Sequence, residues 1–216
     1  MKKISCLMLI LLTSLMTLGG CNTLSSKKPP QFTNDQFYAA DGTFNKEAAK
    51  NAYIALMEYH GCPVYDNVHE GMYVTDFETG KFAEVGLGCF SFMNSYEGRY
   101  MQMDIYLLPD QMLPEHYHLP TEMAQAKNEG WMVRYGLSYI VGEGEANLPP
   151  EVKVPAFTKY TTEHCVPTYP GQYVQLNRVT ARHWQYGGPE GAIITESANY
   201  HDDAGVNFTD KTLIMK

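Results

Sequence analysis

The stretch PEHYHLPTE, residues 114–122, contains two histidines separated by one residue and a glutamate four positions after the second. On a β-strand, side chains two positions apart project to the same face, so His116 and His118 can bind one ion together. Glu122 has the same parity and can reach that ion after a local bend at the intervening proline. A distant histidine, His183 in the segment TARHW, completes the pattern. These four residues predict a metal site with three nitrogen ligands and one oxygen ligand.

This ligand set constrains the kind of site more than the identity of the metal. Three imidazoles and one carboxylate leave coordination positions open on Mn²⁺, Fe²⁺, Ni²⁺, Co²⁺ or Zn²⁺, as a substrate-binding catalytic metal requires. We expect Mn²⁺, with the other four ions as alternatives. For any one of these histidines alone, an ordinary core or surface position is the competing interpretation.

The sequence around this stretch predicts a mainly β domain. Before it, residues 43–59 combine good helix formers with apolar positions and end before Gly61, which predicts one amphipathic helix. Short apolar or alternating runs, separated by glycines and prolines, lie at residues 85–92, 100–108, 132–141, 174–179 and 192–195. Strands at this spacing are typical of an all-β sandwich or barrel. The Pro-rich stretch 145–155 is predicted to be a long loop within a single domain.

The N-terminus has the pattern of an export signal with a lipid anchor. Two lysines precede an apolar run at residues 4–18, which is followed by Leu-Gly-Gly and Cys21. This end resembles a bacterial lipobox, which predicts cleavage after residue 20 and lipidation of Cys21, and an ordinary signal cleaved nearby is the alternative. Residues 21–36 are then a tether and residues 37–216 the domain. The expected location is the bacterial cell envelope, anchored by lipid on the periplasmic or extracellular side of a membrane.

Composition narrows the classes of partner. The chain has 216 residues, of which 44% are hydrophobic, and this is enough to bury a full core. Its formal net charge of −8 repels phosphate backbones, so no nucleic-acid partner is expected. A small molecule is the expected partner, and a homodimer is left open. The sequence has no GxSxG elbow, phosphate-binding Gly-rich loop or dinucleotide fingerprint. The widely spaced Cys62, Cys89 and Cys165 are expected to be structural.

The two histidine segments resemble the first and second motifs of the cupins. The cupins are small β-barrels with a double-stranded β-helix or jelly-roll topology, and their metal lies inside the barrel mouth. Asp110 stands where the first motif usually has glycine, and Arg178 and Thr180 stand where the second usually has proline and glycine. The resemblance implies a single all-β cupin barrel preceded by the N-terminal helix.

A second resemblance covers roughly residues 44–212 and concerns the D-lyxose isomerase family of cupins. It is carried by the helix ending in HGCP at residues 60–63, by VTDFETGKFAEVGLGCF at residues 74–90, and by GPEGAIITE and FTD at residues 188–196 and 208–210. Several matches in the same order along a chain are more specific than the metal motif alone. This resemblance also implies that the metal ligands are His116, His118, Glu122 and His183.

The same resemblance implies a metal-dependent aldose–ketose isomerase that acts on an unphosphorylated sugar such as D-lyxose or D-mannose through an enediol. Glu196 corresponds to an acidic residue near the sugar and is the expected base, with Glu122 as an alternative proton carrier. Weaker expectations of sugar contact fall on residues within or beside the two motifs, for which packing is the competing interpretation: Trp131, Arg134, Tyr135, Tyr139 and Trp184.

One departure from the family concerns lysine. The family carries a lysine on the strand entering the HxH motif and another between the second histidine and the glutamate, whereas this chain has Met103 and the triplet LPT. The alternative hypothesis is therefore a non-catalytic, metal-containing cupin lipoprotein that binds a sugar. The segment His201-Asp202-Asp203 is predicted to be a polar turn before the last strand, with a second ion site as its alternative.

Overall fold

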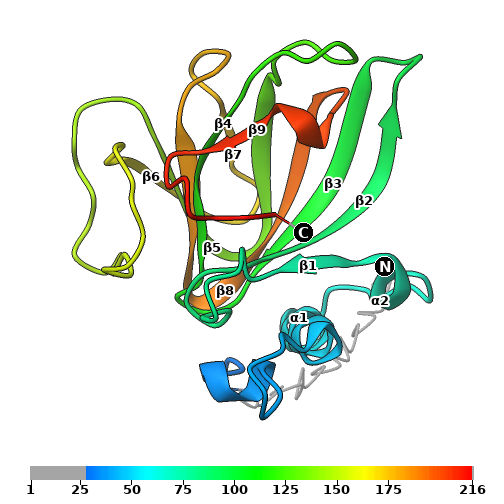
Figure 1. Cartoon of the computed structure of the whole chain (residues 1–216), viewed down its shortest axis with the longest axis vertical. Coiled ribbons are helices and arrows are strands. Elements are labelled where there is room, and N and C mark those ends of the chain that lie inside the picture. The colour runs from blue at the N-terminus through cyan, green and yellow to red at the C-terminus, as the bar shows by residue number, and fades with distance from the viewer. Residues whose placement is uncertain (1–27, 216) are drawn as a thin grey trace, which may run out of the picture.

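The structure is a computed structural model that describes residues 28–215 (Figure 1). Within this range the chain forms one curved sheet and two α-helices, α1 (Lys46–His60) and α2 (Val68–Gly71), with 3-10 turns η1 (Asn34–Phe37) and η2 (Asp203–Gly205). The strands are β1 (Tyr73–Thr75), β2 (Leu87–Ser95), β3 (Tyr100–Leu107), β4 (Met112–His118), β5 (Glu129–Gly142), β6 (His164–Thr168), β7 (Tyr173–Gln175), β8 (His183–Asn199) and β9 (Val206–Phe208). The sheet curls into an open barrel with both helices outside it.

The long strand β8 is the centre of the sheet. Its C-terminal half pairs with β3 and its N-terminal half with β4, while β5 pairs with both halves from the other side. The strand changes direction in the middle, where Gly191 has a φ of 69° and Gly136 of β5 a φ of 72°. A side chain on Gly136 would lie 2.1 Å from the Gly191 carbonyl oxygen, so glycine permits the close crossing. The single strand β8 thus connects the part of the barrel wall formed by β3 with the part formed by β4.

The N-terminal helix packs on the outside of the sheet. Asn45 caps α1 by accepting a hydrogen bond from the Ala48 backbone N–H, and Gly61 ends it in the left-handed conformation. Its buried face carries Tyr53, which lies against β2 at Gly88, where a Cβ atom would approach the tyrosine ring to 2.3 Å. The apolar side chains under α1 thus form a core on the outer face of the sheet, separate from the core inside the barrel where the site lies.

The architecture predicted from the sequence is confirmed: an all-β, cupin-type barrel with one N-terminal helix. The segment predicted as a loop, residues 145–155, contains no helix or strand. The signal peptide and the lipidation site Cys21 lie outside the described residues. Asn34, in the predicted tether, donates to the Glu84 carboxylate at 2.7 Å, so the chain already contacts the domain there. No helix in residues 28–215 is long and apolar enough to cross a membrane.

The cupin motif positions that have lost glycine keep a glycine-like backbone. Asp110 has a φ of 59° and Thr180 a φ of 67°. Such angles are uncommon for any residue with a side chain and are least favourable for a β-branched one. The turns before β4 and β8 therefore retain the left-handed conformation after the residue that favours it has been replaced.

Candidate active site

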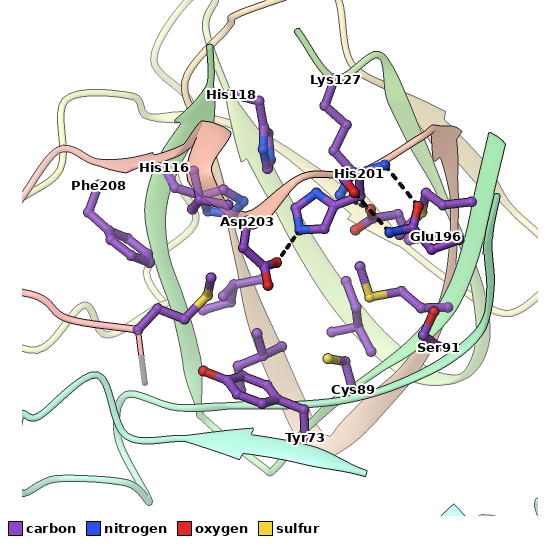
Figure 2. A pocket seen from close by; sticks show the side chains of 18 of the residues that line it. Tyr73, Cys89, Ser91, His116, His118, Lys127, Glu196, His201, Asp203 and Phe208 are labelled. Carbon is purple, nitrogen blue, oxygen red and sulfur yellow. Dashed lines mark hydrogen bonds and ion pairs between the residues drawn. The ribbon is translucent and has the colours of Figure 1, made fainter. Parts of the chain in front are cut away.

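Three histidines from two neighbouring strands meet inside the barrel. His116 and His118 lie on β4, and His183 begins β8 directly opposite His116 in the register of the sheet. One ring nitrogen from each of the three lies within 4.8 Å of the others. The two β4 histidines are seen side by side in Figure 2. The structure therefore brings together the three nitrogen ligands predicted from the sequence.

The backbone fixes the orientation of two of these rings. His116 Nδ1 lies 2.8 Å from the Pro114 carbonyl oxygen, and His183 Nδ1 lies 3.0 Å from that of Ala181. A carbonyl only accepts, so each Nδ1 carries the proton and each Nε2 presents a lone pair. Burial, reinforced by the neighbouring His183, lowers the pKa of His116 to about 3, and burial lowers the pKa of His183 to about 4. Neutral imidazoles with free Nε2 atoms are the form that binds metals.

The fourth group in this cluster is Glu129, the first residue of β5. Its Oε1 atom lies 3.3 Å from His118 Nε2 and 3.2 Å from His183 Nε2, and its side chain is almost fully buried. None of these three atoms has a hydrogen-bond partner among the described residues. Lone pairs that converge in a buried space repel one another, and a divalent cation between them removes both the repulsion and the missing bonds. The donor set fits a metal ion.

The predicted oxygen ligand, Glu122, does not take part in this cluster. It is exposed on the loop after β4 and lines a separate surface cavity with Arg99, Met123 and Tyr200. The chain leaves the strand at Leu119 and Pro120, so the alternation that relates the two histidines stops before it reaches Glu122. The segment Lys-Asn-Glu at the start of an apolar strand is the signal that could have identified Glu129.

Lys127 supplies a buried ammonium group beside the cluster. It lies on the loop between His118 and Glu129, outside the two positions at which the sequence lacks the family's lysines. Its Nζ pairs with both Glu129, at 3.1 Å, and Glu196 on β8. Burial opposes the charge, but the two carboxylates raise the pKa of Lys127 above its usual value. Burial raises the pKa of Glu129, whereas the pKa of Glu196 is lowered because Lys127 outweighs its burial. Lys127 and Glu196 are thus held as a charged pair (Figure 2).

A second pair, His201 and Asp203, faces the same space from the segment before β9. His201 Nε2 lies 2.8 Å from Asp203 Oδ1, and the His201 ring lies 5.8 Å from the His118 ring. Asn94 on β2 holds the backbone of His201 through hydrogen bonds of 2.8 and 2.9 Å. The buried His201 Nδ1 has no partner among the described residues. The sequence predicts a polar turn here, and the structure also places the His201 ring of this turn beside the histidine cluster.

The residues predicted as weak sugar contacts are widely separated. Trp131 lies in the site and donates from Nε1 to Glu196 Oε2 at 3.2 Å. Arg134 and Tyr135 line another cavity, between α1 and the outer face of the sheet, after a bulge that interrupts the pairing of β5 with β8. Trp184 follows His183 on the strand, is fully buried and donates to the Thr162 carbonyl. Tyr139 packs near Tyr186, a residue that also contacts Asp110.

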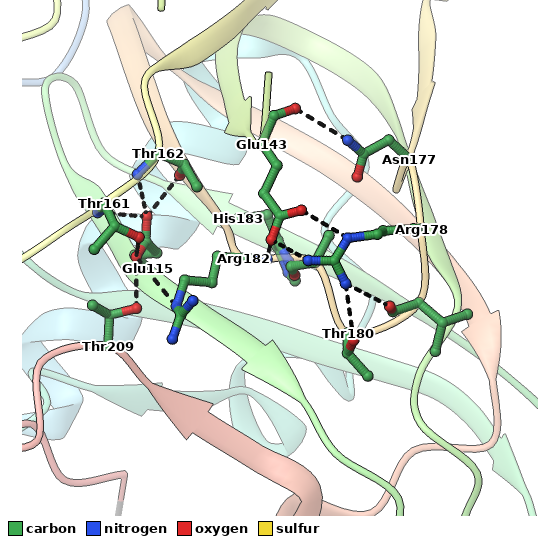
Figure 3. Close-up of polar contacts among 12 residues, drawn as sticks. Glu115, Glu143, Thr161, Thr162, Asn177, Arg178, Thr180, Arg182, His183 and Thr209 are labelled. Carbon is green, nitrogen blue, oxygen red and sulfur yellow. Dashed lines mark hydrogen bonds and ion pairs between the residues drawn. The ribbon is translucent and has the colours of Figure 1, made fainter. Parts of the chain in front are cut away.

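A hydrogen-bond network around Glu115, shown in Figure 3, fixes the end of β4 that carries the histidines. Glu115, which precedes His116, is fully buried and accepts five hydrogen bonds of 2.6–2.9 Å from Thr161, Thr162 and Thr209. Burial alone would raise the pKa of Glu115, but these donors outweigh it and lower the pKa below the usual value. A bidentate pair between Glu143 and Arg178 secures the turn that leads into His183.

The metal-binding cluster and the His201–Asp203 pair border a cavity of about 450 Å³ inside the barrel. Its polar wall consists of His116, His118, Lys127, Glu196, His201 and Asp203, and the rest of its lining is largely apolar. This volume is typical of a pocket for a small molecule. A site with three neutral histidines, a carboxylate and a charged Lys–Glu pair can bind a metal, polarise an oxygen substituent and transfer a proton.

Comparison with known proteins identifies the family. No protein-family model matches the chain. The D-lyxose/D-mannose isomerase of Thermosediminibacter oceani is 32% identical over 167 residues, which are 76% of this chain and 90% of that enzyme. The D-lyxose ketol-isomerase of a Thermofilum species is 30% identical over 167 residues, 76% of this chain and 91% of the relative.

Solved structures support the same fold. The structure of Cellulomonas parahominis L-ribose isomerase with L-ribose superimposes with a TM-score of 0.59 over 82% of this chain and 95% of that one, at 11% identity. At this identity the likeness concerns the cupin-type fold alone. The sequence relatives, together with the cavity and its polar wall, establish that the protein is a sugar isomerase and belongs to the D-lyxose ketol-isomerase family.

Proposed function

We propose that the protein interconverts an unphosphorylated aldose and its ketose with a divalent metal ion, Mn²⁺, held by His116, His118, His183 and Glu129. The observation that carries this proposal is the convergence of the unpartnered Nε2 atoms of His118 and His183 on Glu129 Oε1 at 3.2–3.3 Å, beside the Lys127–Glu196 pair. When bound, the metal acts as a Lewis acid on the substrate's oxygens. Glu129 replaces Glu122 in the ligand set.

Glu196 is the base in this proposal. Its lowered pKa keeps it ionised, and Lys127 and Trp131 fix its position from two sides. It takes the proton from C2, the C2–H electron pair forms the C1–C2 double bond, and the carbonyl oxygen O1 gains a proton. Glu196 then returns the proton taken from C2 to C1, and O2 releases a proton that balances the one gained by O1, which gives the ketose. The Lys127 ammonium is placed to donate to a substrate oxygen during both transfers.

His201 contacts a hydroxyl group of the substrate. Asp203 fixes the tilt of its ring and Asn94 fixes its backbone, so the unpartnered Nδ1 is held toward the cavity. A polar atom held in this way favours a ligand that completes its hydrogen bond and disfavours one that leaves it unpaired.

The sugar and the location are further parts of the proposal. D-Lyxose and D-mannose are the first candidates, because relatives with at least 30% identity are named for them. We propose a location in the bacterial cell envelope, held by a lipid on Cys21, and the apolar run at residues 4–18 followed by Leu-Gly-Gly-Cys supports this. The non-catalytic alternative rested on two missing lysines and on the expected location outside the cytoplasm; the buried Lys127, between His118 and Glu129, answers one of the lysines, and Met103 still stands at the other position.

The test follows proton exchange. The full chain, loaded with Mn²⁺, is incubated in D₂O with a panel of aldoses, and deuterium at C1 and C2 is followed by NMR. We expect deuteration and ketose formation, both abolished by chelation and restored by Mn²⁺. Glu196→Gln should retain the metal and lose about 1,000-fold in kcat. Binding of metal and sugar with no deuteration of any aldose would reject the isomerase, and full exchange by Glu196→Gln would reject only the base.

A further inference from the structure

The cavity changes from polar to apolar along the direction of the strands. On the inner face, Ser91, Met103 and Glu196 lie side by side in the register of β2, β3 and β8. The next inner row contains Tyr73, Cys89 and Ile105, and Leu87 follows below. Rows two residues apart are separated by about 7 Å. The cavity is therefore polar at the level of Glu196 and apolar one row deeper.

The wall next to His116 is also apolar. Phe208, the register partner of His116, contacts Phe77 edge to face with ring centroids 5.2 Å apart, and both line the cavity together with Leu113. Burial raises the pKa of the Cys89 thiol to about 12, so this residue is a neutral, weakly polar group. Figure 2 shows the same division, with the histidines and Lys127 at one end and Cys89 at the other.

Few polar atoms remain for a ligand in the lower part. The hydroxyl of Tyr73 takes part in a hydrogen bond with Thr75. Asn94 already bonds to the backbone of His201, and Ser91 lies one row higher, at the level of Glu196. A hydroxyl group placed among Cys89, Ile105 and Phe77 would lose its water without gaining a protein partner, which disfavours binding.

We propose that the lower part receives a methyl group and that the substrates of this site are 6-deoxyaldohexoses. This inference rests on the proposed isomerase function, which places C1 and C2 beside the metal ligands and Glu196. The four carbon–carbon bonds from C2 to C6 of an open-chain sugar span about 5 Å of the roughly 7 Å between rows, which brings C6 within van der Waals contact of the apolar row. The hydroxyls near C2 then face Lys127 and His201.

The proposal sets an order among three sugars of one configuration. A hexose must place its C6 hydroxyl in the apolar part, so its kcat/KM should lie about 10-fold to 100-fold below that of the 6-deoxy sugar. A pentose avoids that hydroxyl but leaves the apolar part unfilled, so its kcat/KM should lie about fourfold below that of the 6-deoxy sugar.

The experiment measures kcat/KM of the Mn²⁺-loaded full chain with 6-deoxy-D-mannose, D-lyxose and D-mannose, and repeats it with 6-deoxy-L-galactose and L-galactose. The 6-deoxy sugar is expected to be the best of its series. A hexose equal to or better than its 6-deoxy analogue in both series overturns the proposal.

A pair of matched variants locates the effect. Cys89→Ser adds a hydroxyl to the apolar part with almost no change in volume, and it should reduce the preference for the 6-deoxy sugar about fivefold. Cys62→Ser is the control, because Cys62 lines the other cavity, beside α1. An unchanged ratio in folded Cys89→Ser, or an equal change in Cys62→Ser, contradicts the assignment of this wall to C6.

Binding separates this inference from the reaction. If no aldose is turned over, the proposed function fails, and calorimetry with mannitol and 6-deoxymannitol still tests the pocket. Tighter binding of 6-deoxymannitol to the metal-loaded chain supports a methyl-binding site in the absence of catalysis. Equal affinities, or no binding of either alditol, overturn the inference.

Discussion

Two buried glutamates on β4 and β5, which both pair with β8, have opposite surroundings. Glu115 on β4 is fully buried and accepts five hydrogen bonds, whereas Glu129 on β5 is 2% exposed and its Oε1, which lies near Nε2 of His118 and of His183, accepts none from the described residues. The pKa of Glu115 is lowered because its donors outweigh its burial, and that of Glu129 is raised by burial. The satisfied carboxylate stabilises the fold, and the unsatisfied one belongs to the site.

The contrast has a physical basis. A buried carboxylate that is fully hydrogen-bonded has no remaining capacity for a ligand, so its contribution is to stability. A carboxylate that faces other lone pairs costs stability until a cation arrives, and that cost becomes part of the affinity for the cation. Substitutions at the two positions should therefore change different observables.

The largest expected effect comes from Lys127→Met. Removing the ammonium leaves Glu129 and Glu196 buried without their shared cation, and we expect the metal-free protein to lose about 3–5 kcal/mol of unfolding free energy. Urea denaturation measures this. Lys159→Met is the control, because Lys159 is 70% exposed and should change stability by less than about 0.5 kcal/mol. A loss from Lys127→Met no larger than in the control would show that the pair is not coupled to the fold.

Glu129→Gln should lower Mn²⁺ affinity by about 100-fold or more, because it removes the anionic oxygen ligand, while the metal-free chain should change in stability by less than about 1 kcal/mol, because Lys127 keeps Glu196 as its ion-pair partner. Isothermal titration calorimetry measures the affinity. Glu122→Gln, on the neighbouring loop, should bind Mn²⁺ as the wild type does. The reverse result, with metal lost in Glu122→Gln and kept in Glu129→Gln, would restore the ligand predicted from the sequence.

Glu115→Gln should show the opposite profile to Glu129→Gln. The amide presents donors to donors, so about 2 kcal/mol of stability should be lost, with Mn²⁺ affinity changed by less than about tenfold. Thermal unfolding and calorimetry on one preparation measure both. If Glu115→Gln loses metal as strongly as Glu129→Gln, the distinction between a stabilising and a binding carboxylate fails.

Acidification should destabilise the metal-free protein. His116 and His183 have folded pKa values of about 3 and 4, below the unfolded value of about 6.5, so between these limits the unfolded chain binds more protons. Stability should fall by about 1 kcal/mol per pH unit for each histidine as the pH drops from about 6.5 to 4. Urea midpoints measured across this range test the slope, and His116→Gln should make it shallower. A flat profile would mean that the rings are already charged.

The smallest effect concerns the turn before β8. Thr180→Gly relieves a left-handed β-branched residue and should raise stability by about 0.5–1 kcal/mol, after allowance for the greater freedom of glycine in the unfolded chain. Thr180→Ala, which keeps the Cβ atom and loses the hydroxyl, should give no gain. Thermal unfolding compares them. A gain in the alanine variant would mean that the hydrogen bond from Arg178 to the Thr180 hydroxyl, and not the backbone conformation, causes the change in stability.

Local patterns in the sequence predicted the helix and the histidines. Asn45 and Gly61 marked the ends of α1, and two-residue alternation placed His116 and His118 on one face of β4. The cupin resemblance supplied His183. These features depend on neighbouring residues or on a single strand, and this is why they could be inferred without coordinates.

Glu129 and Lys127 could not be found in the same way. The loop from Leu119 to Asn128 contains Lys127 and separates Glu129 from β4. Glu122 was nearer to the histidines along the chain and had the correct parity. What places Glu129 at the histidines is the pairing of β5 with β8, a contact between residues far apart in the sequence. Arg134 and Tyr135 lie away from the cavity for a related reason, because a bulge after Val133 shifts the pairing around Arg134.

The central position of β8 also has a consequence for the order of folding. His183 and Glu196 both lie on this late strand, and its partners β3, β4 and β5 all precede it in the chain. A chain that emerges N-terminus first can pair β2 with β3, but it has neither the third imidazole nor the base until β8 is inserted between strands already made. Such long-range pairing is slow, and it makes native metal uptake a signal that the last step of assembly is complete.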